Sequence, residues 1–226
     1  MEKDPESQHL AYPSAPSIIW VTKAVIFDFG GVIIPSPIAA FSDLEENFHL
    51  PAGTIVSLNM ANHHDNAWAK FERGEVSKEG FVNLFNEEAK RHGVEIDIGS
   101  LFSDYPRPEP HPEMISALEW LKGRYKLGLL TNNFATTSNR LPLKPILGYF
   151  DVVVESSQIG MRKPEERIYQ HTLDLLKADP EEAIFLDDLG INLKPAHKMG
   201  IRTIKVADPT SALEALWELL GDRPSK

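Results

Sequence analysis

Residues 24–32 read AVIFDFGGV, a short apolar run that stops at Asp28 and continues into two glycines. An apolar run of this length that ends at a polar residue predicts a buried parallel strand whose carboxyl end opens into a loop. Ligands bind at those carboxyl ends in open α/β sheets. The segment therefore predicts a parallel sheet and a functional position at Asp28.

Three later segments end in the same way, on residues that can handle phosphate or a metal ion. They are LLTN (129–132), which closes on Thr131 and Asn132, GMRKP (160–164), which closes on Lys163, and AIFLDD (183–188), which closes on Asp187 and Asp188. We interpret each as a strand end, so a carboxylate nucleophile, a hydroxyl, an ammonium group and an acidic pair should meet at one edge of the sheet. Such a set suits a phosphoryl group together with a divalent cation.

The segment after the first strand has a different character. From residue 33 to about residue 110, aromatic and aliphatic residues recur at helix-like spacings among charges, without a clear strand pattern. Ser77 to Gly80 offers a helix start before Phe81, and four prolines between 106 and 112 mark the return. We expect a helical cap domain at 35–108.

The cap is expected to interrupt a core formed by residues 20–34 and 109–222. Helices are predicted at about 112–123, from 165 onward, near 192–199 and around 213–220, and further strands at 152–155 and 202–206. Strands separated by helices imply parallel pairing with right-handed crossovers. The predicted fold is α/β, a three-layer Rossmann-like parallel sheet core with an inserted helical cap, and residues 1–19 are expected to be a flexible tail.

Composition excludes several classes of protein. A net charge of −10 argues against nucleic-acid binding, and the absence of cysteine excludes disulfides, zinc thiolates and thiol catalysis. No apolar stretch approaches the roughly 18 residues of a membrane span. The first twenty residues carry acidic side chains and lack an apolar h-region, so we expect no secretory signal and a cytoplasmic location.

The order of these motifs resembles the haloacid dehalogenase superfamily, in which Asp-x-Asp-x-Thr/Val is followed by Ser/Thr, then Lys, then an acidic pair. The resemblance runs from about Ala24 to about Leu220. Residues 154–165 and 185–196 look close to the N-terminal phosphatase domain of soluble epoxide hydrolase, and the cap segment 71–75 is similar to bacterial sugar-phosphate phosphatases. The resemblance implies a phosphatase that uses Mg²⁺ and acts on a small phosphorylated metabolite.

The resemblance also implies a role for each site residue. Asp28 would be the nucleophile that forms an aspartyl-phosphate. Thr131 and Asn132 would hydrogen-bond the phosphoryl oxygens, and Lys163 would neutralise the charge that develops on them. Asn192 is expected either to bond to the acidic loop or to cap a helix.

The two glycines after Asp28 allow the backbone to approach a phosphate closely, so Gly30 and Gly31 belong to the expected phosphate site. Two unit charges about 4 Å apart repel by roughly 4 kcal/mol at an effective dielectric of 20. A cluster of acidic side chains therefore needs a cation. By resemblance, the Mg²⁺ ligands are Asp28, the main-chain carbonyl of Gly30 and Asp188, with Asp187 in support.

Gly30 departs from the pattern, because phosphatases of this superfamily usually carry there an Asp that protonates the leaving-group oxygen. General acid catalysis is worth about 10²- to 10⁴-fold, so its loss should matter least for anomeric, acyl or aryl phosphates. Sugar-1-phosphate phosphatases that resemble this chain also carry Gly at that position. Two alternatives stay open: a non-catalytic domain that binds a ligand or partner, and a 2-haloacid dehalogenase, whose chemistry needs no metal.

Residues of the expected cap also allow two interpretations. His63 and His64 either lie on the surface or reach the leaving group in place of the missing acid. Glu72, Arg73 and Glu75 form either a solvated helix end or a contact between cap and core. The sequence identifies neither the substrate nor the oligomeric state.

Overall fold

The computed structural model describes residues 21–36, 38–102, 109–133 and 144–224, and the expected tail at 1–19 lies outside them. Five parallel strands form one sheet in the order β3-β2-β1-β4-β5. Their bounds are β1 (Ala24–Phe27), β2 (Lys126–Thr131), β3 (Val152–Glu155), β4 (Ala183–Asp187) and β5 (Arg202–Lys205). The predicted α/β class is confirmed, and the AVIF run forms the central strand.

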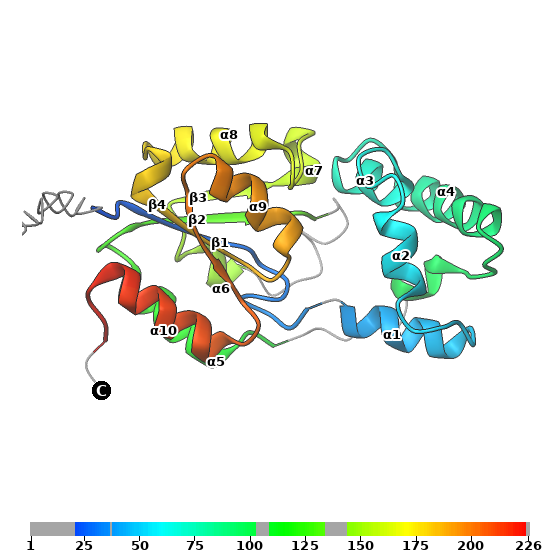
Figure 1. Cartoon of the computed structure of the whole chain (residues 1–226), viewed down its shortest axis with the longest axis horizontal. Coiled ribbons are helices and arrows are strands. Elements are labelled where there is room, and N and C mark those ends of the chain that lie inside the picture. Colours follow the sequence, from blue (N-terminus) through cyan, green and yellow to red (C-terminus); the bar gives the residue numbers. More distant parts are fainter. Residues whose placement is uncertain (1–20, 37, 103–108, 134–143, 225–226) are drawn as a thin grey trace, which may run out of the picture.

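Helices cover both faces of the sheet, which gives three layers. They are α5 (Pro112–Leu121), α6 (Lys144–Leu147), α7 (Ser156–Ile159), α8 (Glu166–Leu176), α9 (Gly190–Lys198) and α10 (Pro209–Leu220), with a short η2 (Pro180–Glu182) before β4. Helices α5 and α10 lie on one face, and α8 and α9 lie on the other (Figure 1).

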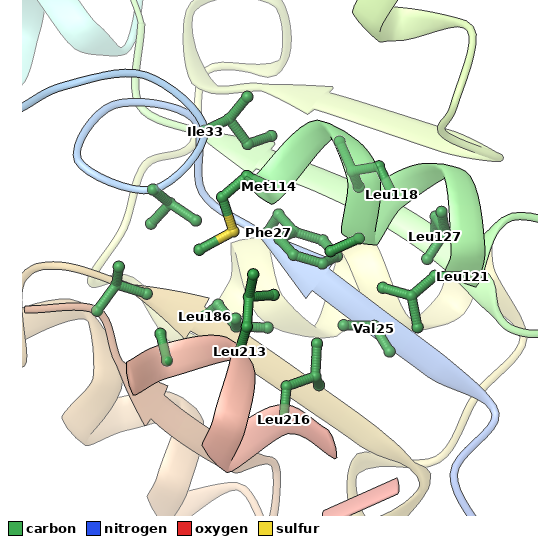
Figure 2. Packing of buried hydrophobic residues seen from close by; sticks show 14 of the residues in the cluster. Val25, Phe27, Ile33, Met114, Leu118, Leu121, Leu127, Leu186, Leu213 and Leu216 are labelled. Carbon is green, nitrogen blue, oxygen red and sulfur yellow. The ribbon is translucent and has the colours of Figure 1, made fainter. Parts of the chain in front are cut away.

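The side chains of β1 alternate between these two layers, although all four are buried. Val25 and Phe27 pack with Met114 and Leu118 of α5 and with Leu213 of α10, as Figure 2 shows. The intervening Ile26 packs in a second cluster with residues of α8 and α9. A strand that is apolar on both faces requires cover on both, and this is why the sequence pattern identified the sheet.

A helical insert, residues 38–102, lies between β1 and α5. It contains α1 (Ile38–Asn47), α2 (Thr54–Met60), α3 (Ala67–Glu72), α4 (Lys78–Arg91) and η1 (Ile98–Phe102), and it lies beyond the carboxyl ends of the strands (Figure 1). The insert has its own apolar cluster, in which the rings of Phe71 and Phe81 stack with centroids 4.5 Å apart. Ser77 caps α4 by accepting from Gly80 N at 3.1 Å, at the helix start that the sequence predicted.

One strand prediction was wrong. Lys163 does not end a strand, because β3 already ends at Glu155 and the chain then forms α7. Gly160 ends that helix in the left-handed conformation, with φ +66°, and Lys163 follows in the loop before α8. The segment 160–163 carries only one large apolar residue, which is too little to bury a strand on both faces.

Among the residues that the structure describes, no helix is long and apolar enough to cross a membrane. The limits of the cap at 35–108 stay a prediction, because residues 37 and 103–108 lie outside the described ranges.

Candidate active site

Asp28 follows directly after the central strand and is 7% exposed. Its main-chain N–H donates to Leu186 O of β4 at 2.9 Å, which fixes the residue at the carboxyl edge of the sheet. Its Oδ1 accepts from Phe29 N at 2.7 Å and pairs with Lys163 Nζ at 2.8 Å. The carboxylate is thus held in one orientation at the end of β1.

The acidic pair lies beside Asp28, at the carboxyl end of the neighbouring strand β4, which ends at Asp187. One carboxylate oxygen from each of Asp28, Asp187 and Asp188 lies within 4.8 Å of the other two. Lys163 Nζ also donates to Asp187 Oδ2 at 2.7 Å, so the fully buried ammonium joins two of the three carboxylates. Asn192 Nδ2 donates to both oxygens of Asp187, at 3.0 and 3.1 Å, which is the expected bond to the acidic loop.

The charges in this cluster are not balanced. Burial raises the pKa of Asp28 to about 8. The ammonium of Lys163 lowers this pKa and only partly offsets the effect of burial, whereas the charge of Asp187 raises it further. Burial and the neighbouring Asp187 also raise the pKa of Asp188. Burial lowers the pKa of Lys163, but Asp187 and Asp28 outweigh it and raise that pKa above its usual value. Three carboxylates face one ammonium, and an all-oxygen donor set of this kind fits a Mg²⁺ ion.

The loop after Asp28 approaches the acidic pair closely. Gly31 has φ +76°, and a Cβ atom there would lie 2.1 Å from Asp188 Oδ2. The same oxygen accepts a hydrogen bond from Ser36 Oγ at 3.1 Å. Position 31 therefore requires glycine, because its φ is positive and because Asp188 leaves no space for a Cβ atom. The sequence pattern did not single out Ser36, whose only signal is its place at the end of this loop.

Thr131 is the last residue of β2 and is 8% exposed, so it lies at the same edge of the sheet. The next side chain, Asn132, donates from Nδ2 to Lys163 O at 2.9 Å and to Glu72 Oε2 at 3.1 Å, and its Oδ1 accepts from Lys163 N at 2.8 Å. Both hydrogens of the amide group are used. A contact of Asn132 with a phosphoryl oxygen stays a prediction.

The helical insert contacts the core beside this site. Glu72 is 8% exposed, and its Oε2 pairs with Arg162 Nε at 2.6 Å, so it forms a contact between insert and core. Arg162 Nη1 also donates to His63 O at 2.9 Å. The ring centroids of His63 and His64 are 3.9 Å apart. Sequence reasoning missed Arg162, whose only signal is its place before Lys163.

Comparison with known proteins identifies the chain at the level of its family. Residues 22–200 match the model of the haloacid dehalogenase-like hydrolases. The chain belongs to that family. The match covers β1 to α9, and thus every site residue described above.

Several known proteins are similar in sequence to this haloacid dehalogenase-like chain. Acyl-CoA dehydrogenase family member 10 of Mus musculus is 40% identical over 204 residues, which are 88% of this chain and 19% of that protein. Bifunctional epoxide hydrolase 2 of Sus scrofa is 30% identical over 215 residues, 88% of this chain and 39% of that protein. The chain therefore spans less than half of either relative. Sesquiterpene phosphatase astK of Aspergillus oryzae is 28% identical and matches over 97% of its length.

Solved structures confirm the haloacid dehalogenase-like fold. A predicted hydrolase of the family from Porphyromonas gingivalis has a TM-score of 0.64 at 22% identity, covering 90% of this chain and all of that one. A family enzyme from Bacteroides thetaiotaomicron, solved with magnesium and inorganic phosphate, has a TM-score of 0.60 at 22% identity, covering 85% of this chain and 98% of that one.

Proposed function

We propose that this hydrolase is a Mg²⁺-dependent phosphatase that acts on a small phosphorylated metabolite. The observation that carries the proposal is the convergence of Asp28, Asp187 and Asp188 within 4.8 Å, with Lys163 bonded to two of them. The relatives support it, since they include the sesquiterpene phosphatase and a phosphoglycolate phosphatase of Aquifex aeolicus, 24% identical over 190 residues. The solved relative with magnesium and phosphate is also in line with it.

In this proposal, Asp28, Asp188 and the main-chain carbonyl of Gly30 hold Mg²⁺, and Asp187 supports them. The ion, when bound, neutralises charge on the phosphoryl oxygens and acts as a Lewis acid. Asp187 is suited to a supporting role, because its two oxygens already accept bonds from Lys163, Asn192 and Leu189 N.

In the proposed phosphoryl transfer, each of these residues has a separate role. An oxygen of the Asp28 carboxylate attacks phosphorus, and the bond between phosphorus and the ester oxygen breaks. The leaving oxygen takes its proton from solvent, because Gly30 offers no side-chain acid. Lys163 and Thr131 stabilise the charge on the phosphoryl oxygens. Water then attacks the phosphorus of the aspartyl-phosphate, which releases inorganic phosphate and restores Asp28.

The helical insert is the proposed cap, with limits at 35–108. Its contact with the core at Glu72 and Arg162 keeps it beside the carboxyl ends of the strands. A cap in this position would exclude bulk water from the site during transfer.

The experiment that tests the proposal is a phosphatase assay with and without Mg²⁺ on aryl, acyl, anomeric and simple alkyl phosphates, with Asp28→Asn as the blank. We expect Mg²⁺-dependent turnover of the activated esters, with alkyl esters slower by about 10²- to 10⁴-fold because the general acid is missing. Equal rates for both classes would show that another acid acts, for which His63 and His64 are candidates. No turnover by a folded protein that binds Mg²⁺ would favour the non-catalytic alternative.

A further inference from the structure

We propose that Glu72 is a positioning residue that couples the docking of the helical insert to the placement of Lys163, through the side chain of Asn132. The inference rests on the proposed phosphatase function, in which Lys163 stabilises charge on the phosphoryl group. Glu72 ends α3 of the insert, whereas Asn132 and Lys163 belong to the core.

Glu72 is a buried carboxylate with several polar partners. Its Oε1 accepts from Trp68 Nε1 at 2.9 Å, within the insert. Its Oε2 accepts from Arg162 Nε at 2.6 Å and from Asn132 Nδ2 at 3.1 Å. Its main-chain carbonyl accepts from Ser156 Oγ at 2.6 Å. Three of these partners belong to the core, so the residue does more than end a helix.

Asn132 holds the main chain of Lys163 at two points. Its Oδ1 accepts from Lys163 N at 2.8 Å, and its Nδ2 donates to Lys163 O at 2.9 Å. The second hydrogen of the same Nδ2 is directed to Glu72. The orientation of the amide group, and with it the grip on Lys163, is therefore set from the side of the insert.

The insert and the core meet closely at this point. Gly74 has φ +70°, and a Cβ atom there would lie 2.6 Å from Ser157 O. Arg73 Nη1 lies 3.4 Å from Glu165 Oε1. These neighbours fix the end of α3 against the core, and Glu72 contacts the side chain of Asn132, which holds the main chain of Lys163.

Displacement of Lys163 should affect the chemical step more than binding. A misplacement of about 1 Å can cost roughly 100-fold in rate. In Glu72→Gln an NH₂ group replaces one of the two acceptor oxygens. It then faces either the donor Trp68 Nε1 or the two donors Arg162 Nε and Asn132 Nδ2, and it can accept from none of them. We expect kcat to fall by about 10- to 100-fold, with KM within about threefold of wild type.

The test compares Glu72→Gln with Glu75→Gln in the whole chain. Glu75 is the matched control, because it is also a glutamate paired with an arginine, but its partner Arg73 lies within the insert and not in the core. The first measurement is kcat and KM for p-nitrophenyl phosphate with Mg²⁺, per mole of folded protein. The second, which does not depend on activity, is amide hydrogen exchange by NMR at Lys163. The N–H of Leu189, which donates to Asp187 Oδ1 at 2.8 Å, is the reference.

We expect the Lys163 amide to exchange at least about tenfold faster in Glu72→Gln, because its acceptor is no longer held. The Leu189 amide should not change, and Glu75→Gln should match wild type in both measurements. Unchanged exchange at Lys163 would overturn the inference. So would a parallel rise at both amides, because Glu72 would then act only on global stability. If wild type lacks Mg²⁺-dependent turnover, the proposed function fails, and the exchange comparison still decides whether Glu72 controls Lys163.

Discussion

Replacement of Asp28 by Asn should make the metal-free protein more stable at neutral pH, although it removes the proposed nucleophile. In the unfolded chain, an Asp with a pKa of about 3.9 is ionised at pH 7. In the folded chain, burial raises the pKa of Asp28 to about 8 despite the nearby Lys163. The folded protein therefore favours the neutral form, and the ionised form opposes folding.

The sign and the size follow from linkage between folding and protonation. A carboxyl whose pKa is raised by folding contributes stability below its unfolded pKa of about 4, and this contribution is lost as the pH rises to about 8. Each pH unit in that window is worth about 1.4 kcal/mol. By pH 7 the stability lost through this difference in pKa thus approaches about 4 kcal/mol, because folded Asp28 still holds a proton that the unfolded chain has released. The Asp28→Asn variant does not carry this cost, because its amide does not titrate.

The assay is urea unfolding of wild type and Asp28→Asn in a chelator at pH 5, 6 and 7. The stability advantage of the variant should grow with pH. Asp151→Asn is the control, because folding shifts the pKa of Asp151 in the opposite direction to that of Asp28. Although burial of Asp151 acts the other way, the Leu127 N–H at 2.9 Å and Lys126 Nζ at 3.0 Å lower its pKa. Its contribution is present above its unfolded pKa, so this variant should be less stable than wild type at pH 7.

Two results would refute the reasoning about Asp28. One is a metal-free Asp28→Asn protein that is less stable than wild type at pH 7. The other is a stability difference that stays constant between pH 5 and pH 7, since a group with a raised pKa must change its contribution in that range.

Three further changes test the surroundings of the site. Gly31→Ala should cost about 2 kcal/mol more in unfolding free energy than Gly93→Ala, because both have φ near +75° but only the first meets Asp188; equal costs would contradict this. Mg²⁺ at about 100 times its Kd should stabilise wild type by about 2.7 kcal/mol, with most of the effect lost in Asp188→Asn, and an unfolding midpoint insensitive to Mg²⁺ would count against the ligand set. Asn192→Leu should lower the free energy of unfolding by about 1–3 kcal/mol, because two hydrogen bonds to buried Asp187 disappear. A urea midpoint equal to that of wild type would contradict this expectation.

The parts of the fold that the sequence predicted are those governed by local apolar runs. The strands that carry Asp28 and Asp187 are buried on both faces, so each reads as a continuous apolar segment with a polar residue at its carboxyl end. Parallel pairing then brings the two carboxylates to one edge. The wrong strand at Lys163 arose because the chain reaches this edge through α7 and a loop, where no periodic pattern applies.

The contacts of Asn132 and Glu72 could not be read from local pattern. Position 132 follows a strand, which places the residue at the functional edge but leaves the direction of its amide open. That direction depends on Glu72, which is 60 residues away in the sequence. Such a contact depends on how the insert packs on the core, and a single sequence carries no periodic signal for it.

The largely buried pair of Glu72 and Arg162 also constrains how new enzymes can be made from this scaffold. Its side chains are 11% and 12% exposed, and removal of one partner from a buried pair typically costs about 3–5 kcal/mol. A chimera that receives the insert of a relative brings a foreign residue to position 72 but keeps the recipient's Arg162. Exchanges of the insert should therefore transfer both positions together with Asn132, or the grafted protein will begin with an unpaired guanidinium beside its active site.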